Sequence, residues 1–188
     1  MVFDCHSDLF TDVTVKMLKG EKDIIKNHYL DELKNANLIG GIDPPYDKCP
    51  QKRVKQVIEC LTEEINSNSD IIKQIKQFSD FEVALKQDKL SVLVGMEGLS
   101  YIGEDVDMLH YFYDVVGARH ASLTWNEQNA LATGVGGDPL RGLTDSGKNA
   151  VRKLEELKMI VDVSHANEKS FWDRRRRDRN VQPVPRNL

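Results

Sequence analysis

Apolar residues along this chain follow two periodicities, and the two alternate. Short apolar runs rich in β-branched residues indicate buried strands, whereas apolar positions three and four residues apart indicate amphipathic helices. Val54, Ile58, Leu61 and Ile65 have the helical spacing. We therefore expect a helix from Val54 onward and further helices at 105–116 and 144–157, with strands near 2–8, at 38–42, within 90–100, and at 117–126 and 158–165.

Three shorter helices are also expected from capping residues. "IIKQI" at 71–75 follows Asn68 and Ser69, either of which can cap a helix start. Ser79 and Glu82 have the spacing of a capping box ahead of "FEVALKQ". A last helix is expected to begin near Asn167. The strand–helix alternation, without hairpin signals, predicts an α/β fold with a parallel sheet and crossover helices, and by pattern alone both doubly wound and barrel forms remain open.

Composition narrows the class of protein. The chain has 188 residues, of which 40% are hydrophobic and 30% charged, as in a single globular domain. No apolar run approaches the ~18 residues of a membrane span, and the first residues, "MVFDCHSD", lack the pattern of a secretory signal. We therefore expect no contact with membrane. The three cysteines, Cys5, Cys49 and Cys60, are scattered without CxxC spacing, which predicts reduced thiols in a cytoplasmic protein.

Charge is distributed unevenly. Residues 173–188 hold six of the 26 basic residues and two of the 30 acidic ones, so the remainder carries a net charge of −8. An acidic body is not expected to bind nucleic acid.

Metal-ligand residue types recur at the ends of predicted strands. His6 and Asp8 share one face of the first strand because side chains alternate along a strand. Glu97 ends the run at 90–97 between two glycines, and His165 ends the strand at 158–165. Carboxyl ends of parallel strands gather on one side of the fold. Two histidines and two carboxylates suit zinc.

Four segments resemble, in order and spacing, the renal (membrane) dipeptidase family of zinc peptidases. They are "FDCHSDL", "VGMEGLSYIG", "ASLTWNEQNALATG" and "GLTDSGKNAVRKLEELKMIVDVSHANEKSFWD". The resemblance implies a TIM-like barrel over residues 1–173 with two zinc ions at its carboxyl face. His6 and Asp8 are then ligands of one zinc, His165 of the other, and Glu97 bridges both as the catalytic carboxylate. The implied reaction is hydrolysis of dipeptides by a hydroxide held between the metals.

The chain departs from the family in two places. Trp125 stands at or next to the position where many members have a substrate-binding histidine, and it either walls the substrate pocket or belongs to the core. The family's last three strands, which supply another zinc-binding histidine, an arginine and an aspartate, have no counterpart. We therefore expect a barrel truncated after about five strands. Residues 174–188 form a basic tail, interpreted as aberrant sequence or as an arm for an acidic partner.

Two other functions stay open beside zinc-dependent dipeptide hydrolysis. One is a truncated, non-catalytic remnant that binds at most one zinc and self-associates through its open sheet edges. The other is an amidohydrolase-like enzyme acting on a non-peptide amide. "GLTDSGKN" at 142–149 nearly matches a phosphate-binding loop, but Asn149 replaces the hydroxyl that such loops need. His28, His110 and His120 are interpreted as surface or packing histidines.

Overall fold

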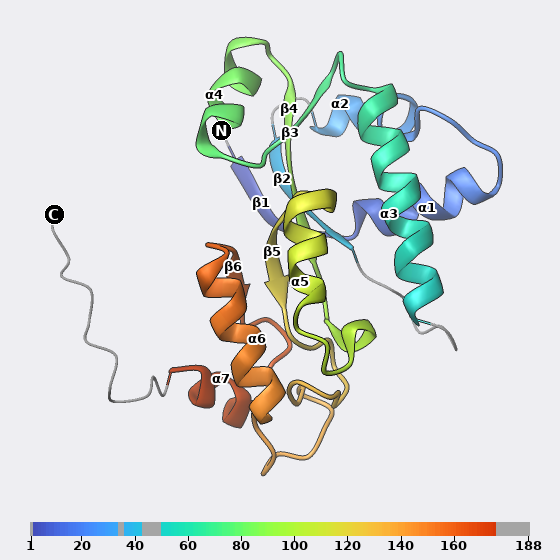
Figure 1. Ribbon diagram of the computed structural model, residues 1–188. Helices are drawn as coiled ribbons and strands as arrows, with labels where there is room; N and C mark the ends of the chain where they lie inside the picture. Colours follow the sequence, from blue (N-terminus) through green and yellow to red (C-terminus); the bar gives the residue numbers. More distant parts are fainter. Residues whose placement is uncertain (1, 34–35, 43–49, 176–188) are drawn as a thin grey trace, which may run out of the picture.

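A computed structural model describes residues 2–33, 36–42 and 50–175, with the side chains of 7–33 and 51–174 (Figure 1). Within these ranges the chain forms one parallel sheet in the order β1-β2-β4-β5-β6, with β3 paired to β4. β3 pairs with the first residues of β4, and β5 pairs with its last ones. The strands are β1 (Val2–Ser7), β2 (Ala36–Ile42), β3 (Ile72–Gln74), β4 (Leu90–Met96), β5 (Ala118–Ser122) and β6 (Ile160–Asp162).

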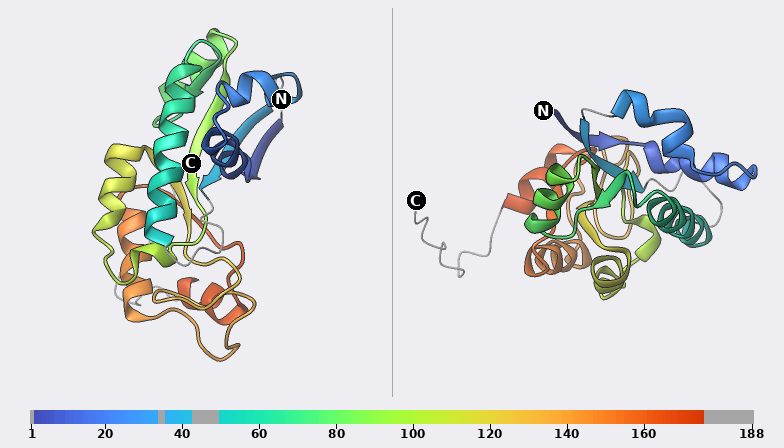
Figure 2. Two further views of the ribbon diagram at one scale, coloured as in Figure 1. Left: turned by 90° about the vertical axis from the view of Figure 1, so that its right-hand side faces the viewer. Right: turned by 90° about the horizontal axis from the view of Figure 1, so that it is seen from above.

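Helices connect these strands. Seen from above in Figure 2, helices α3, α5 and α6 form an arc along one side of the sheet. A π-helical segment, Ile25–Tyr29, precedes α2, and another, Phe112–Val116, continues α5. The helices are α1 (Leu9–Leu18), α2 (Leu30–Leu33), α3 (Pro50–Ser67), α4 (Phe78–Lys86), α5 (Met108–Tyr111), α6 (Asp145–Glu156) and α7 (Glu168–Arg175).

The core lies between β4 and the helices. Val92, Val94 and Met96 alternate along β4 and are fully buried. Leu109 of α5 and Phe112 of the π-helical segment that continues it belong to the same apolar cluster. Because every second residue of β4 packs into this cluster, the intervening residues, which include Ser91 and Glu97, belong to the opposite face of the sheet.

The prediction of an α/β fold with a parallel sheet is confirmed, and so are the long helix from residue 54 and the helix after Thr144. The Thr144 hydroxyl accepts a hydrogen bond from the Gly147 N–H at 3.0 Å, as an N-cap residue does. In the described part of the chain, no helix is both long and apolar enough to span a bilayer.

The helix predicted at 71–75 is wrong. Ile72–Gln74 is strand β3, in register with Leu90–Val92 of β4. Asn68 does not begin a helix there; it ends the preceding one, with its side-chain amide donating to Glu64 O at 3.0 Å. Apolar spacing in a five-residue segment does not distinguish a helical turn from a short strand. Here the segment forms a strand because it pairs with the exposed edge of β4.

Two predicted boundaries lie close to the ends of helices. The expected capping box of Ser79 and Glu82 is shifted by two residues. Gln77 precedes the helix, which begins at Phe78, and Asp80 accepts from the Gln77 N–H. The predicted division at residue 173 falls inside α7, which runs to Arg175. Beyond Arg175 the predicted tail lies outside the described residues.

Candidate metal centre

Glu97 follows the last residue of β4 and is held there by contacts to the segment after β5. Its side chain is only 6% exposed. The next residue, Gly98, has φ +68° and donates its N–H to Ser122 Oγ at 2.9 Å. A Cβ at Gly98 would lie 3.1 Å from Trp125 N. Glycine therefore permits both the left-handed backbone and the close approach that place Glu97 at this end of the sheet.

His165 lies in the turn that follows β6. Its backbone has φ +64°, which non-glycine residues seldom adopt. The His165 carbonyl accepts from Val135 N at 2.9 Å, and Gly134 forms a β-bridge to Ala166. The glycine-containing loop at 134–137 thus holds the turn that carries His165.

Glu97 and His165 meet although 68 positions separate them in the chain. His165 Nε2 lies 2.9 Å from Glu97 Oε1, and its other ring nitrogen, Nδ1, lies 3.0 Å from Asn126 Oδ1. Both ring nitrogens therefore face oxygen acceptors. Only a doubly protonated imidazolium can donate to both. An imidazole nitrogen and a carboxylate oxygen are also both groups that bind zinc.

Trp125 lies beside this pair. Its ring centroid is 6.1 Å from that of His165, with the ring planes inclined at 37°. Trp125 is half-buried. Gly134 and Gly136 lie against the adjoining backbone, where the Gly136 N–H donates to Asn126 O at 2.8 Å. A Cβ at Gly134 would overlap Trp125 O at 2.2 Å, so this loop can hold Trp125 and Asn126 only with glycine at that position.

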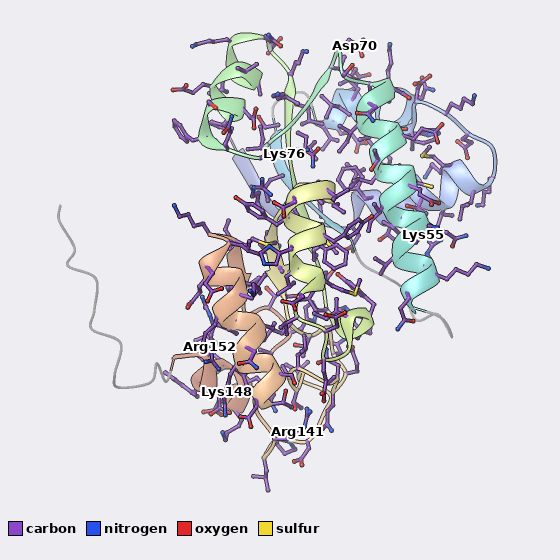
Figure 3. The ribbon with its side chains drawn as sticks, viewed as in Figure 1. Lys55, Asp70, Lys76, Arg141, Lys148 and Arg152 are labelled. Carbon is purple, nitrogen blue, oxygen red and sulfur yellow. The ribbon has the colours of Figure 1, made fainter. Side chains whose placement is uncertain are left out.

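Arg141 holds together the loop at the same end of the molecule. Its guanidinium donates to Ala132 O, to Thr133 Oγ1 and to Asn129 O at 2.8–3.1 Å. Figure 3 shows Arg141 near the start of α6, far from Lys55 on α3. The loop that follows Trp125 is therefore closed on itself by hydrogen bonds.

The predicted ligands from the first strand are described less completely. The His6 side chain lies outside the described side chains. Asp8 is exposed and directly precedes α1, whose first turn begins with Thr11 N donating to Asp8 O at 3.0 Å. β1 and β4 are parallel and separated only by β2, so their carboxyl ends lie about 10 Å apart. Among the side chains of 7–33 and 51–174, no three histidine, cysteine, aspartate or glutamate residues form a cluster that could hold a metal.

Sequence reasoning missed two features of this region. Asn126 contacts His165, but an asparagine after a strand has no distinctive spacing. His120, interpreted as a surface or packing histidine, is buried and lies 3.1 Å from Asp162 Oδ2. The other two histidines are surface residues beside carboxylates: His28 lies 3.0 Å from Glu21 and His110 lies 3.9 Å from Asp114.

Known proteins that are similar to this chain include several described as dipeptidases or metallopeptidases. Two solved metallopeptidase structures share the fold, with TM-scores of 0.80 and 0.78 at 22% identity, each covering 92% of this chain. One is a dipeptidase; the other, from Rhodobacter sphaeroides, is liganded with a phosphinate mimic of the dipeptide L-Ala-D-Ala. An uncharacterised dipeptidase of Schizosaccharomyces pombe is 29% identical over 178 residues, which are 89% of this chain.

The comparison with the solved structures thus shows an α/β fold that this chain shares with metallopeptidases. The model of the membrane dipeptidase family (peptidase family M19) matches residues 2–176, and the chain belongs to this family. The resemblance seen in the sequence and the TIM-like fold class are both confirmed. The chain covers 60% and 61% of the two solved chains and 40% of the Schizosaccharomyces pombe protein.

Proposed function

We propose that this chain supplies part of a zinc-dependent dipeptidase centre in which Glu97 and His165 are metal ligands. One observation carries the proposal: the two side chains converge to 2.9 Å from the ends of β4 and β6. Carboxylate oxygen and imidazole nitrogen are both groups that bind zinc. The residues present therefore fit the metal that the family uses.

The ligand set is completed in the proposal by His6 and Asp8. With Glu97 they would hold one zinc ion, and Glu97 together with His165 would hold a second. Support for the first position comes from topology, since β1 and β4 are parallel and their carboxyl ends lie on the same edge of one sheet.

Zinc, when bound, lowers the pKa of a water molecule to about 7 and polarises a carbonyl oxygen. The chain's own residues bind and orient. Asn126 Oδ1 holds Nδ1 of His165, which directs Nε2 toward Glu97. Such an outer partner fixes the tautomer of a metal-binding histidine. Trp125, beside His165, presents an apolar wall for a substrate side chain.

Dipeptides are the proposed substrates, with a D-residue accepted at the second position. The chemistry of the ligand in the Rhodobacter sphaeroides structure supports this choice. The assigned residues give the first zinc position three protein ligands and the second only two. Catalytic zinc sites usually have three. We therefore propose that this chain holds one zinc tightly and hydrolyses dipeptides slowly.

The test is elemental analysis of zinc per chain, combined with hydrolysis of L-Ala-L-Ala, L-Ala-D-Ala and a non-peptide amide. About one zinc per chain and slow hydrolysis restricted to dipeptides are expected. A chain that takes up no zinc would refute the metal centre. One zinc without any hydrolysis would identify a non-catalytic binding protein, and faster hydrolysis of the non-peptide amide would identify a different amidohydrolase.

A further inference from the structure

A second histidine–carboxylate pair joins β5 to β6, one layer of side chains away from the strand ends. His120 Nε2 lies 3.1 Å from Asp162 Oδ2, and the two side chains are 9% and 18% exposed. The strands are in register, with His120 opposite Ile160 and Ser122 opposite Asp162. The pair therefore ties adjacent strands together diagonally across their shared face.

Asp162 uses its other oxygen on the turn that leads to His165. Asp162 Oδ1 accepts from Ser164 N and from Ser164 Oγ, both at 2.8 Å. An aspartate that accepts from the N–H two residues ahead closes an Asx-turn. One carboxylate thus connects β5 to the turn, and His165 is the residue that follows Ser164.

The turn needs such support because His165 has φ +64°. A non-glycine residue in the left-handed region is strained, and it stays there only where the surroundings hold it. The Val135 N–H holds the His165 carbonyl on one side, and Asp162 holds Ser164 on the other. A change in this turn would move the His165 ring relative to Glu97.

The ionisation of Asp162 agrees with this arrangement. The hydrogen bond from His120, followed by those from Ser164, keeps the pKa of Asp162 well below its usual range, against the opposing effect of burial. Asp162 is therefore an ionised acceptor at neutral pH. His120 Nδ1 is buried without a hydrogen-bond partner among the described residues.

We propose that Asp162 is a positioning residue for the metal centre: anchored by His120, it holds the 162–165 turn so that His165 Nε2 faces Glu97. This inference rests on the proposed function, because positioning matters to the protein only if His165 is a ligand. Asp162 itself is not proposed to touch the metal or the substrate.

The experiment uses the full chain, first without metal. Long-range ¹H–¹⁵N spectra report the tautomer and environment of the His165 ring, assigned with a His165→Gln variant. Asp162→Ala is expected to shift the His165 ring signals, and in a titration with zinc chloride to weaken affinity about 10–100-fold, the range for outer partners of metal-bound histidines. Asp162→Asn keeps an acceptor for Ser164 and is expected to lose less.

Rescue by a conservative change separates positioning from bulk stability. His120→Gln retains a side-chain N–H donor for Asp162, so its His165 signals and zinc affinity are expected to stay closer to the parent chain than those of His120→Ala. His28→Gln, at an exposed histidine that also faces a carboxylate, serves as the matched control and is expected to change neither.

Three outcomes decide the matter. Lower thermal stability in Asp162→Ala, with unchanged His165 signals and zinc affinity within twofold of the parent chain, would overturn the proposal. If Asp162→Ala fails to fold, unchanged ring signals in Asp162→Asn and Ser164→Ala would do the same. A parent chain that binds no zinc but whose His165 ring shifts in Asp162→Ala would refute the proposed function while supporting the positioning of His165.

Discussion

Two histidine–carboxylate pairs occur on the same sheet, one at its carboxyl edge and one between its strands. Glu97–His165 joins the ends of β4 and β6 at 2.9 Å, with the histidine 26% exposed. His120–Asp162 joins β5 to β6 at 3.1 Å, with the histidine 9% exposed. The two pairs are chemically alike but differ in what surrounds them.

The difference lies in how the acceptors are satisfied. Asp162 has a complete set of donors: His120, and Ser164 through both its N–H and its hydroxyl. His165 lies between two side-chain oxygens, Glu97 Oε1 and Asn126 Oδ1. The interior pair joins two strands and the turn after them, whereas the pair at the edge of the sheet brings together an imidazole and a carboxylate, two groups that bind zinc.

The largest effect is expected from Glu97→Gln. The substitution replaces one carboxylate oxygen with an amide and removes the charge that the proposed centre needs, so zinc affinity is expected to fall at least about 100-fold. Changes at residues that hold a metal ligand in place cost about 10–100-fold in affinity, and the loss of a direct ligand should cost no less. Isothermal titration with zinc checks this. Equal losses in Glu97→Gln and in the surface variant His110→Ala would mean that the ligands are wrongly assigned.

A loss of folding stability is expected from His120→Ala. It leaves the half-buried Asp162 carboxylate without its inter-strand donor, which costs about 1–3 kcal/mol in the free energy of unfolding. Urea denaturation followed by circular dichroism measures the change. A loss below about 0.5 kcal/mol would show that the interior pair contributes no more than an exposed ion pair.

A similar but smaller loss is expected from Gly98→Ala. The new Cβ must adopt φ +68° and would sit 3.1 Å from Trp125 N, so destabilisation of about 1–2 kcal/mol is expected. Gly20→Ala is the matched control, because Gly20 has φ +91° but nothing within 4 Å of an added Cβ. Equal destabilisation in both variants would mean that the backbone conformation alone causes the loss. A larger loss in Gly98→Ala would show that the close approach to Trp125 contributes as well.

Acid sensitivity should distinguish the interior pair at low pH. The folded-state pKa of Asp162 is depressed by His120 and Ser164, so its stabilising effect is complete above its ordinary value of 3.8 and is lost as the pH falls below it. Below pH 4, the free energy of unfolding of the parent chain is expected to fall more steeply with decreasing pH than that of Asp162→Asn. The difference between the two slopes is expected to be smaller than the slope for the uptake of one proton. Parallel slopes in urea titrations at pH 3 and pH 5 would contradict this.

The smallest effect is expected at the exposed histidine His28. It is 40% exposed beside Glu21, so His28→Ala should change the free energy of unfolding by less than about 0.5 kcal/mol and leave zinc affinity unaltered. A clear loss of zinc in this variant, measured by the same titration, would place part of the metal centre away from the strand ends.

Local chemistry accounts for what could be predicted from the sequence. The apolar spacing from Val54 and the Thr144 cap each act within one or two turns, so they predicted α3 and the start of α6 correctly. Glu97 and His165 were singled out because each follows a predicted strand, and parallel strands bring their carboxyl ends together. Residues 71–75 were mistaken for a helix because the free edge of β4 outweighed a weak local preference.

Contacts between distant segments could only be decided by the tertiary structure. His120 and Asp162 are 42 positions apart, and nothing around His120 in the sequence indicates that it is buried against a carboxylate. Asn126 is 39 positions from His165, and it reaches the ring because glycines at 134 and 136 let two loops approach closely. The sequence by itself determined the family, the parallel sheet and the residue types at the strand ends. Strand register and loop packing decided which of those side chains meet and which partners they bind. Both depend on contacts between distant segments, which local spacing does not encode.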